Sequence, residues 1–199
     1  METDVFLTIT KESEGFYSEK GSKFYAFAYP VSTEEDIKSI QQSLRKKYYD
    51  ARHHVYAFIL GPEKKAYRAS DDGEPANSSG MPVLGQIKSF EITDVLIVVV
   101  RYFGGTKLGV PGLINAYRTA AKGALENADI VEKFITKSAE IDFAYDDMNF
   151  VMKVLNDSGA KILSQTFLES CNIIFSIRLS EFDKLISNLR KNHKIEIKL

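Results

Sequence analysis

Apolar residues follow two periods in the first two thirds of the chain. Alternating or continuous apolar runs predict strands over 6–9, 16–18, 24–31, 54–60, 65–69 and 95–100. Helical spacing predicts a helix opened by a capping box, with Ser32 at the N-cap and Glu35 at N3, and further helices over 82–90 and 111–126. The run 95–100 is the most apolar, so we expect it in the centre of a sheet, covered on both faces. Residues 1–136 are therefore predicted to form one α+β domain.

The last third of the chain has its own complete pattern. Strands are predicted over 139–145, 161–168, 172–179 and 195–199. One helix is predicted around 148–155, ending at Gly159, and a second around 182–189, with Ser180 as its N-cap. The order β-α-β-β-α-β is that of the ferredoxin-like split βαβ arrangement. Residues 137–199 are therefore predicted to form a second α+β domain of this fold.

Composition restricts the classes of function. The chain has 199 residues, with 26 Lys and Arg against 27 Asp and Glu. A net charge of −1 excludes coating of nucleic acid or anionic membrane by bulk charge, but it leaves room for a local basic patch. The single cysteine, Cys171, excludes an intrachain disulfide. Together with only three histidines it leaves too few ligands for a structural zinc site, so we expect no metal and no cofactor.

The segment RYFGGTKLGVPG at 101–112 is the first candidate site. It follows the most apolar strand and leads into a helix, so free backbone N–H groups, glycines and Lys107 combine as an anion site. No acid occurs over 95–125, whereas four cations do: Arg101, Lys107, Arg118 and Lys122. The spacing matches neither Walker A nor the dinucleotide fingerprint. A tight strand-to-helix turn that needs positive φ at its glycines explains the segment equally well.

The loop SDDGEPANSSGMP at 70–82 is the second candidate. Asp71, Asp72 and Glu74 suit a surface turn, a hard cation such as Mg²⁺, or pairing with arginines of a neighbouring loop. Their spacing is not that of an EF-hand. A third candidate is Arg52-His53-His54. Adjacent histidines on a strand point to opposite faces, so we expect one buried ring and one that is free to hydrogen-bond.

Four motifs together resemble the Impact family, in its bacterial YigZ-like branch. They are KGSKF at 20–24, ARHH at 51–54, SDDGEP at 70–75 and VVVRYFGGTKLG at 98–109, and the resemblance extends over essentially the whole chain. It implies an N-terminal domain of the ribosomal protein S5 domain 2-like fold and a C-terminal ferredoxin-like domain similar to those of elongation factors. It also implies a link to translation, through protein binding in eukaryotic members and through nucleic-acid or ribosome binding in bacterial ones.

Several residues match the family motifs, and two regions depart from them. The sequence NSSG at 77–80 stands where many members have Gly-Thr-Ala-Gly, and Pro111 and Asn115 stand where many have Gly and Arg. The second departure predicts a weaker basic groove. The matching positions are Lys20, Gly21, His53, Asp71, Asp72, Gly73, Glu74, Arg101, Gly104, Gly105, Lys107 and Gly109.

Three hypotheses follow. The first is a non-enzymatic, translation-linked protein that binds RNA, the ribosome or another phosphate-bearing ligand, with the acidic loop positioning the cations. The second is an enzyme for a phosphorylated or acidic small molecule, which uses the acidic loop and His53. The third is a protein-interaction module. The expected anion-site residues are Lys20, Arg101, Gly104, Gly105, Lys107, Gly109 and Arg118, with Arg52 and His53 as further candidates.

The location of the protein is predicted from the apolar runs. The longest, at 95–100, is far below the roughly 18 residues that a membrane span needs. The first eight residues contain no basic region followed by an apolar one, as a secretory signal would. We therefore expect a cytoplasmic protein without membrane contact. The oligomeric state cannot be derived from these patterns.

Overall fold

The computed structural model describes residues 4–168 and 170–199. Met1–Thr3, part of the segment where no secretory signal is expected, lie outside the described residues. Contacts divide the chain into Phe6–Lys133 and a second unit of Phe134–Leu199, to which Asp4 and Val5 also belong. Each unit combines helices with antiparallel strands, so the α+β class predicted from the sequence is confirmed.

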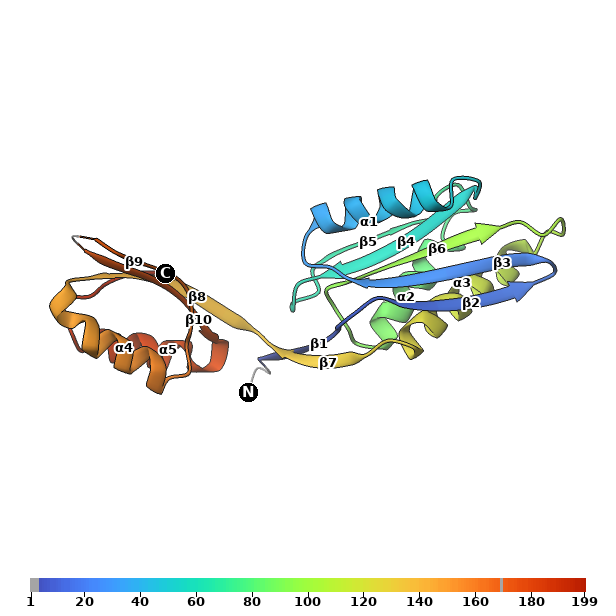
Figure 1. Ribbon diagram of the computed structural model, residues 1–199. Helices are drawn as coiled ribbons and strands as arrows, with labels where there is room; N and C mark the ends of the chain where they lie inside the picture. The colour runs from blue at the N-terminus through green and yellow to red at the C-terminus, as the bar shows by residue number, and fades with distance from the viewer. Residues whose placement is uncertain (1–3, 169) are drawn as a thin grey trace. The chain divides into compact units, whose positions relative to one another are not determined.

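A five-stranded antiparallel sheet forms the centre of the first unit (Figure 1), in the order β2-β3-β6-β4-β5. Strand β6 occupies the middle of this order and is buried from Val95 to Arg101, which confirms the predicted central strand. Two further strands, β1 and β7, pair in a sheet of their own. The strands are β1 (Val5–Ile9), β2 (Ser13–Glu19), β3 (Ser22–Pro30), β4 (His53–Leu60), β5 (Ala66–Ser70), β6 (Val95–Tyr102) and β7 (Ile130–Phe134).

Helices cover both faces of this sheet (Figure 1). Helix α1 (Glu34–Lys47) packs on one face, where Ile37 and Leu44 join a core with Phe27, Leu96 and Val98. Helices α2 (Gly80–Ser89) and α3 (Gly109–Glu126) pack on the other. Apolar side chains are thus buried on both faces of the sheet, in two separate clusters.

All three helix starts in the first unit differ from the sequence prediction. Helix α2 starts at Gly80, two residues before the predicted start at 82. The capping box of α1 is shifted by one residue: Thr33 is the N-cap and Asp36 is at N3, instead of Ser32 and Glu35. Both registers place a hydroxyl three residues before an acid, so the sequence alone does not choose between them. Helix α3 starts at Gly109, two residues before the predicted start at Pro111, because proline is also accommodated in the first turn beyond its first position.

The second unit has a four-stranded antiparallel sheet in the order β11-β8-β10-β9, with α4 and α5 on one face. Its element order, β-α-β-β-α-β, is the predicted one. Cys171 is the first residue of β10 and is buried in this core, rather than lying between two strands. The elements are β8 (Thr136–Phe143), a 3-10 turn (Tyr145–Asp147), α4 (Met148–Asp157), β9 (Lys161–Phe167), β10 (Cys171–Arg178), α5 (Leu179–Leu189) and β11 (Glu196–Lys198).

The start of α5 is another correction. Ser180 is not the N-cap, because the helix already begins at Leu179. The Ser180 N–H instead donates to a carboxylate oxygen of Asp4 at 3.3 Å, and the Arg178 guanidinium binds the same carboxylate at 2.5 and 2.6 Å. A residue at the other end of the sequence thus supplies the acidic group that a local cap would provide.

Candidate functional site: a basic cavity at the glycine turn

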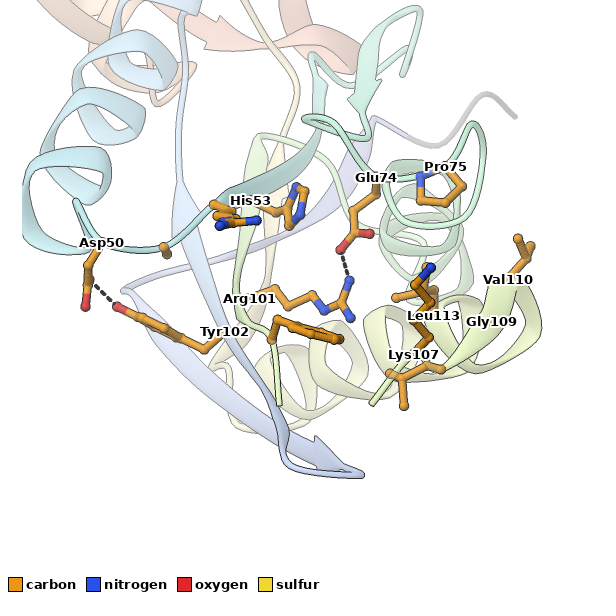
Figure 2. Close-up of a pocket in the computed structure, with 14 residues that line it drawn as sticks. Asp50, His53, Glu74, Pro75, Arg101, Tyr102, Lys107, Gly109, Val110 and Leu113 are labelled. Atoms are coloured by element: carbon orange, nitrogen blue, oxygen red, sulfur yellow. Dashed lines mark hydrogen bonds and ion pairs between the residues drawn. The ribbon is translucent and has the colours of Figure 1, made fainter. Parts of the chain in front are cut away.

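A cavity of about 840 Å³ opens where β6 ends (Figure 2). Three stretches that are distant in the sequence form its wall: the start of β4, the acidic loop, and the segment that runs from the end of β6 through the glycine turn into α3. This volume lies in the range of small-molecule sites. The lining residues are 50–53, Glu74, Pro75, 101–103, 107–110 and Leu113.

Arg101 lies at the floor of this cavity as half of a buried ion pair. Its Nη1 donates to Glu74 Oε1 at 2.6 Å, and the two side chains are 7% and 4% exposed. The Tyr117 hydroxyl donates to the same Oε1 at 2.7 Å. Burial, followed by the charge of Glu74, raises the pKa of Tyr117 far above its ordinary value, so the phenol remains a donor. Arg101 therefore commits one terminal nitrogen inside the protein instead of presenting its whole fork to a ligand.

The other two acids of the loop face other partners. Asp71 Oδ1 accepts hydrogen bonds from Ser79 N, Ser79 Oγ and Gly80 N at 2.6–3.0 Å, and its Oδ2 accepts from Asn77 N at 2.8 Å. These contacts hold the first turn of α2. Desolvation raises the pKa of Asp71, but hydrogen bonds led by that of the Ser79 side chain outweigh it, and the net pKa is lowered.

Asp72 ties the acidic loop to α1 and β4. Its Oδ1 accepts from Arg45 Nη2 at 2.7 Å, and its Oδ2 accepts from the backbone N–H of His54 at 2.6 Å. The Asp72 carbonyl lies 2.9 Å from His53 Nδ1. Because a carbonyl oxygen only accepts, His53 Nδ1 carries a proton in this contact.

The two adjacent histidines behave as predicted. His54 is buried among the residues between the sheet and α1, and burial, with a further contribution from the Arg45 charge, lowers its pKa. His53 is half-buried and lines the cavity (Figure 2). Gly73 lies against its ring: a β-carbon at this glycine, whose φ is +86°, would be 3.6 Å from His53 Nδ1.

The predicted glycine turn contacts the hairpin between β2 and β3. Lys20 and Gly21 both have positive φ, 47° and 78°, and form the two-residue turn of that hairpin. A β-carbon on Gly104 would lie 1.9 Å from the carbonyl carbon of Gly21. Gly104 is therefore required by close backbone approach, whereas Gly105 and Gly109 have positive φ, at 87° and 73°. Lys20 is exposed at the hairpin tip and does not line the cavity.

The positive charge that remains available at the cavity comes from Lys107 and Arg52. Both are exposed, both line the cavity, and neither forms an ion pair with any residue of the described ranges. The first turn of α3 lies beside them, without a side-chain cap and without an acid. The remaining two cations of the acid-free stretch are elsewhere. Arg118 is exposed outside the cavity, and Lys122 pairs with Glu126 at 3.1 Å.

The carboxylates do not converge around a cation. Asp71, Asp72 and Glu74 are held by a helix start, by Arg45 and by Arg101, respectively. Within residues 4–168 and 170–199, no three His, Cys, Asp or Glu side chains gather in a way that could hold a metal ion. Convergence of these acids with His53 was the geometry that the enzyme hypothesis needed, so the arrangement does not favour it.

Sequence reasoning missed four residues at this site. Tyr117 lies on the apolar face of α3, where it is read as a core residue, yet its hydroxyl binds Glu74. Arg45 stands among the cations that end α1. The Tyr102 hydroxyl donates to Asp50 at 2.7 Å, which raises the pKa of the phenol to about 12. Phe103 belongs to the motif at 98–109, but the sequence does not show that its ring is exposed.

These features define a class of protein: an α+β unit with a basic cavity beside a glycine turn, followed by a β-α-β-β-α-β unit. Residues 20–125 match the family described as the Impact N-terminal domain. The chain belongs to the IMPACT family. It is 30% identical over 153 residues to the IMPACT family member YvyE of Bacillus subtilis, a match that covers 77% of this chain and 70% of that protein.

Two further comparisons extend over most of the chain. IMPACT family member YigZ of Escherichia coli is 30% identical over 150 residues, which cover 74% of each chain. A solved structure described as the crystal structure of an hypothetical protein superposes with a TM-score of 0.78 at 24% identity, over 98% of this chain and 97% of that one. The structural match shows that the fold recurs. None of the helices in the described part of the chain is long and apolar enough to cross a membrane.

Proposed function

We propose that the protein is a translation-linked binding protein that holds a phosphate-bearing ligand, in the first place RNA, in the cavity at the glycine turn. The observation that carries this proposal is the position of Lys107 and Arg52, two cavity cations without an acidic partner among the described residues, next to the open start of α3. Free N–H groups and the dipole at a helix start favour an anion, and both cations would add to this.

The charge balance of the cavity supports the same ligand class. Its lining holds three cations, Arg52, Arg101 and Lys107, and two carboxylates, Asp50 and Glu74. Glu74 is neutralised by Arg101, and Asp50 accepts a hydrogen bond from Tyr102. In this proposal Arg101 fixes the wall of the cavity, while Lys107 and Arg52 contact phosphates. The net charge of −1 for the whole chain would then confine binding to this region.

We assign the phosphate contact to the first unit alone. The sheet face of the second unit that the helices leave uncovered carries Glu140 and Asp142, which share Asn172 and Lys198 as partners. Carboxylates repel phosphates, and Lys198 is already bound to both of these, so this face suits RNA less than the cavity does. The S5 domain 2-like and ferredoxin-like fold names are part of this proposal. The strand order β11-β8-β10-β9 supports the second of them.

Salt-dependent binding tests the proposed function. We expect a labelled RNA to bind the full chain with an affinity that falls steeply with salt, because each phosphate contact releases counterions. The double change Lys107→Ala with Arg52→Ala should weaken binding and reduce the slope by about one unit per lost contact. Arg118→Ala, which removes an exposed cation of α3 outside the cavity, is the matched control. Equal affinity and slope for the double variant and the control would refute the proposal.

A protein-interaction role has one observation in its favour. Strand β9 is an edge of its sheet, and Leu163, Phe167 and Leu168 are exposed along it and just beyond it. Exposed edge strands with apolar side chains are sites for pairing with another chain. If this alternative holds, a defined protein should be captured from native lysate after nuclease treatment, and Leu163→Asp should abolish its capture.

A further inference from the structure

Phe103 is an exposed ring at the wall of the cavity. Its side chain is 56% exposed, although it follows a buried arginine directly and lines the same cavity. The guanidinium carbon of Arg101 lies 5.7 Å from the centroid of the Phe103 ring and 5.5 Å from that of Phe24. Since Arg101 is itself fixed by Glu74, one side of the Phe103 ring rests against a buried, immobile group. The remainder of the ring faces solvent and the cavity.

A second phenylalanine shows why the position matters. Phe16 has the same exposure, 56%, but it packs against Tyr25 at a centroid distance of 5.1 Å and does not line the cavity. Single exposed apolar residues are common on protein surfaces, and Phe16 requires no explanation. Phe103 differs because it adjoins Lys107 and the open start of α3 in one cavity. A flat apolar surface thus lies beside anion-binding groups.

We propose that Phe103 is a stacking surface for an unpaired nucleobase, so that the ligand of the cavity is single-stranded nucleic acid. This inference rests on the proposed function and narrows its ligand class. Proteins that bind single strands combine aromatic rings, on which bases stack, with cations that follow the backbone. In a duplex both faces of a base are covered by its neighbours, so a paired strand cannot use the ring.

The cavity has room for this arrangement. A volume of about 840 Å³ admits one base together with its sugar and phosphate. The base would lie on Phe103, and the phosphate would face Lys107 and the N–H groups of Gly109 and Val110, all in one turn of the chain. Ring and cations would act on the same nucleotide, so removing the ring should weaken binding without changing how the affinity depends on salt.

The chain offers a clean optical reporter for the stacking contact. It contains no tryptophan, so Phe103→Trp introduces the single indole of the protein and retains an aromatic face. We expect a short single-stranded RNA to quench this fluorescence on binding. The same sequence in a duplex, an abasic ribose-phosphate strand and inorganic phosphate should leave it almost unchanged. Quenching of equal size by the abasic strand would overturn the inference.

Affinities provide the second measurement. Phe103→Leu retains apolar volume but removes the π-face, and it should weaken binding of the single-stranded RNA by about 5- to 100-fold while Phe103→Trp binds like the original protein. Phe16→Leu, at the same exposure outside the cavity, is the control and should bind unchanged. Thermal unfolding of each variant establishes that the fold is retained. Equal binding by Phe103→Leu and Phe16→Leu would overturn the inference.

The outcomes separate the two proposals. If the original protein binds single-stranded, abasic and duplex ligands equally and in a salt-dependent manner, the result supports the phosphate site and refutes the stacking surface. If it binds none of the three ligands, both proposals are refuted. A preference for the base-bearing single strand that Phe103→Leu abolishes, with the salt slope unchanged, supports both.

Discussion

Glu74 and Arg101 form an ion pair of 2.6 Å between two side chains that are almost completely buried. Glu74 comes from the acidic loop and Arg101 from the central strand β6, and the Tyr117 hydroxyl of α3 joins them at the same carboxylate oxygen. One oxygen therefore fixes three elements of the cavity wall relative to one another. The acidic loop acts here as a structural brace for the glycine turn.

Removing the carboxylate should be costly. Glu74→Ala leaves the charge of Arg101 buried without its partner, and breaking a buried pair in this way costs about 3–5 kcal/mol of the free energy of unfolding. Urea denaturation followed by circular dichroism measures it. Glu63→Ala, which removes the acid of an exposed pair with Lys65, is the control and should have little effect. A stability of Glu74→Ala equal to that of the control would show that the Glu74–Arg101 pair does not stabilise the fold.

The glycine turn yields a contrast between neighbours. Gly104→Ala should destabilise by about 1–3 kcal/mol, because its β-carbon would collide with the backbone of Gly21 and force the hairpin away. Gly105→Ala meets no atom within 4 Å and costs only the strain of its positive φ, about 1 kcal/mol. Denaturation midpoints of the two variants should therefore differ. Equal losses would contradict the assignment of Gly104 to close contact with the hairpin.

Local pattern predicted the elements well and their ends less well. The run 95–100 is apolar without interruption, and both faces of the strand are buried as that pattern requires. The predicted start of α5 was wrong because Asp4, the acid that binds its first turn, is more than 170 residues away in the sequence. No window that contains Ser180 also contains Asp4.

The candidate site could be located from the sequence but its internal roles could not. Arg101 and Lys107 belong to one motif, and the sequence predicts that both bind an anion. The fold separates them: Arg101 is buried beneath the acidic loop, whereas Lys107 is exposed at the cavity. This difference depends on the packing of β6 against the acidic loop and α3, which the spacing of charges along the chain does not contain.

The lowered pKa of Asp71 predicts a loss of stability in acid. Its pKa is lowered in the folded protein, so the unfolded chain binds a proton first as the pH falls. The stabilisation is therefore present above the ordinary aspartate range and is lost below it. Asp71→Asn should lower stability at neutral pH by about 0.5–2 kcal/mol, as for a lost helix cap, and flatten the profile between about pH 3 and 5. Asp157→Asn, which removes no side-chain hydrogen bond of the described residues, is the control. An unchanged slope for Asp71→Asn would refute the assignment.

His54 predicts a second, separate loss nearer neutrality. Burial lowers the pKa of this imidazole in the folded protein, the Arg45 charge lowers it further, and Asp72 opposes both. The unfolded chain therefore takes up a proton first as the pH falls below about 6.5, and stability declines from there until the folded ring is protonated too. His54→Phe should remove this decline, whereas His193→Gln, at an exposed position, should retain it. The free energy of unfolding between pH 8 and 5 measures the difference. A decline that persists in His54→Phe would contradict its assignment to this imidazole.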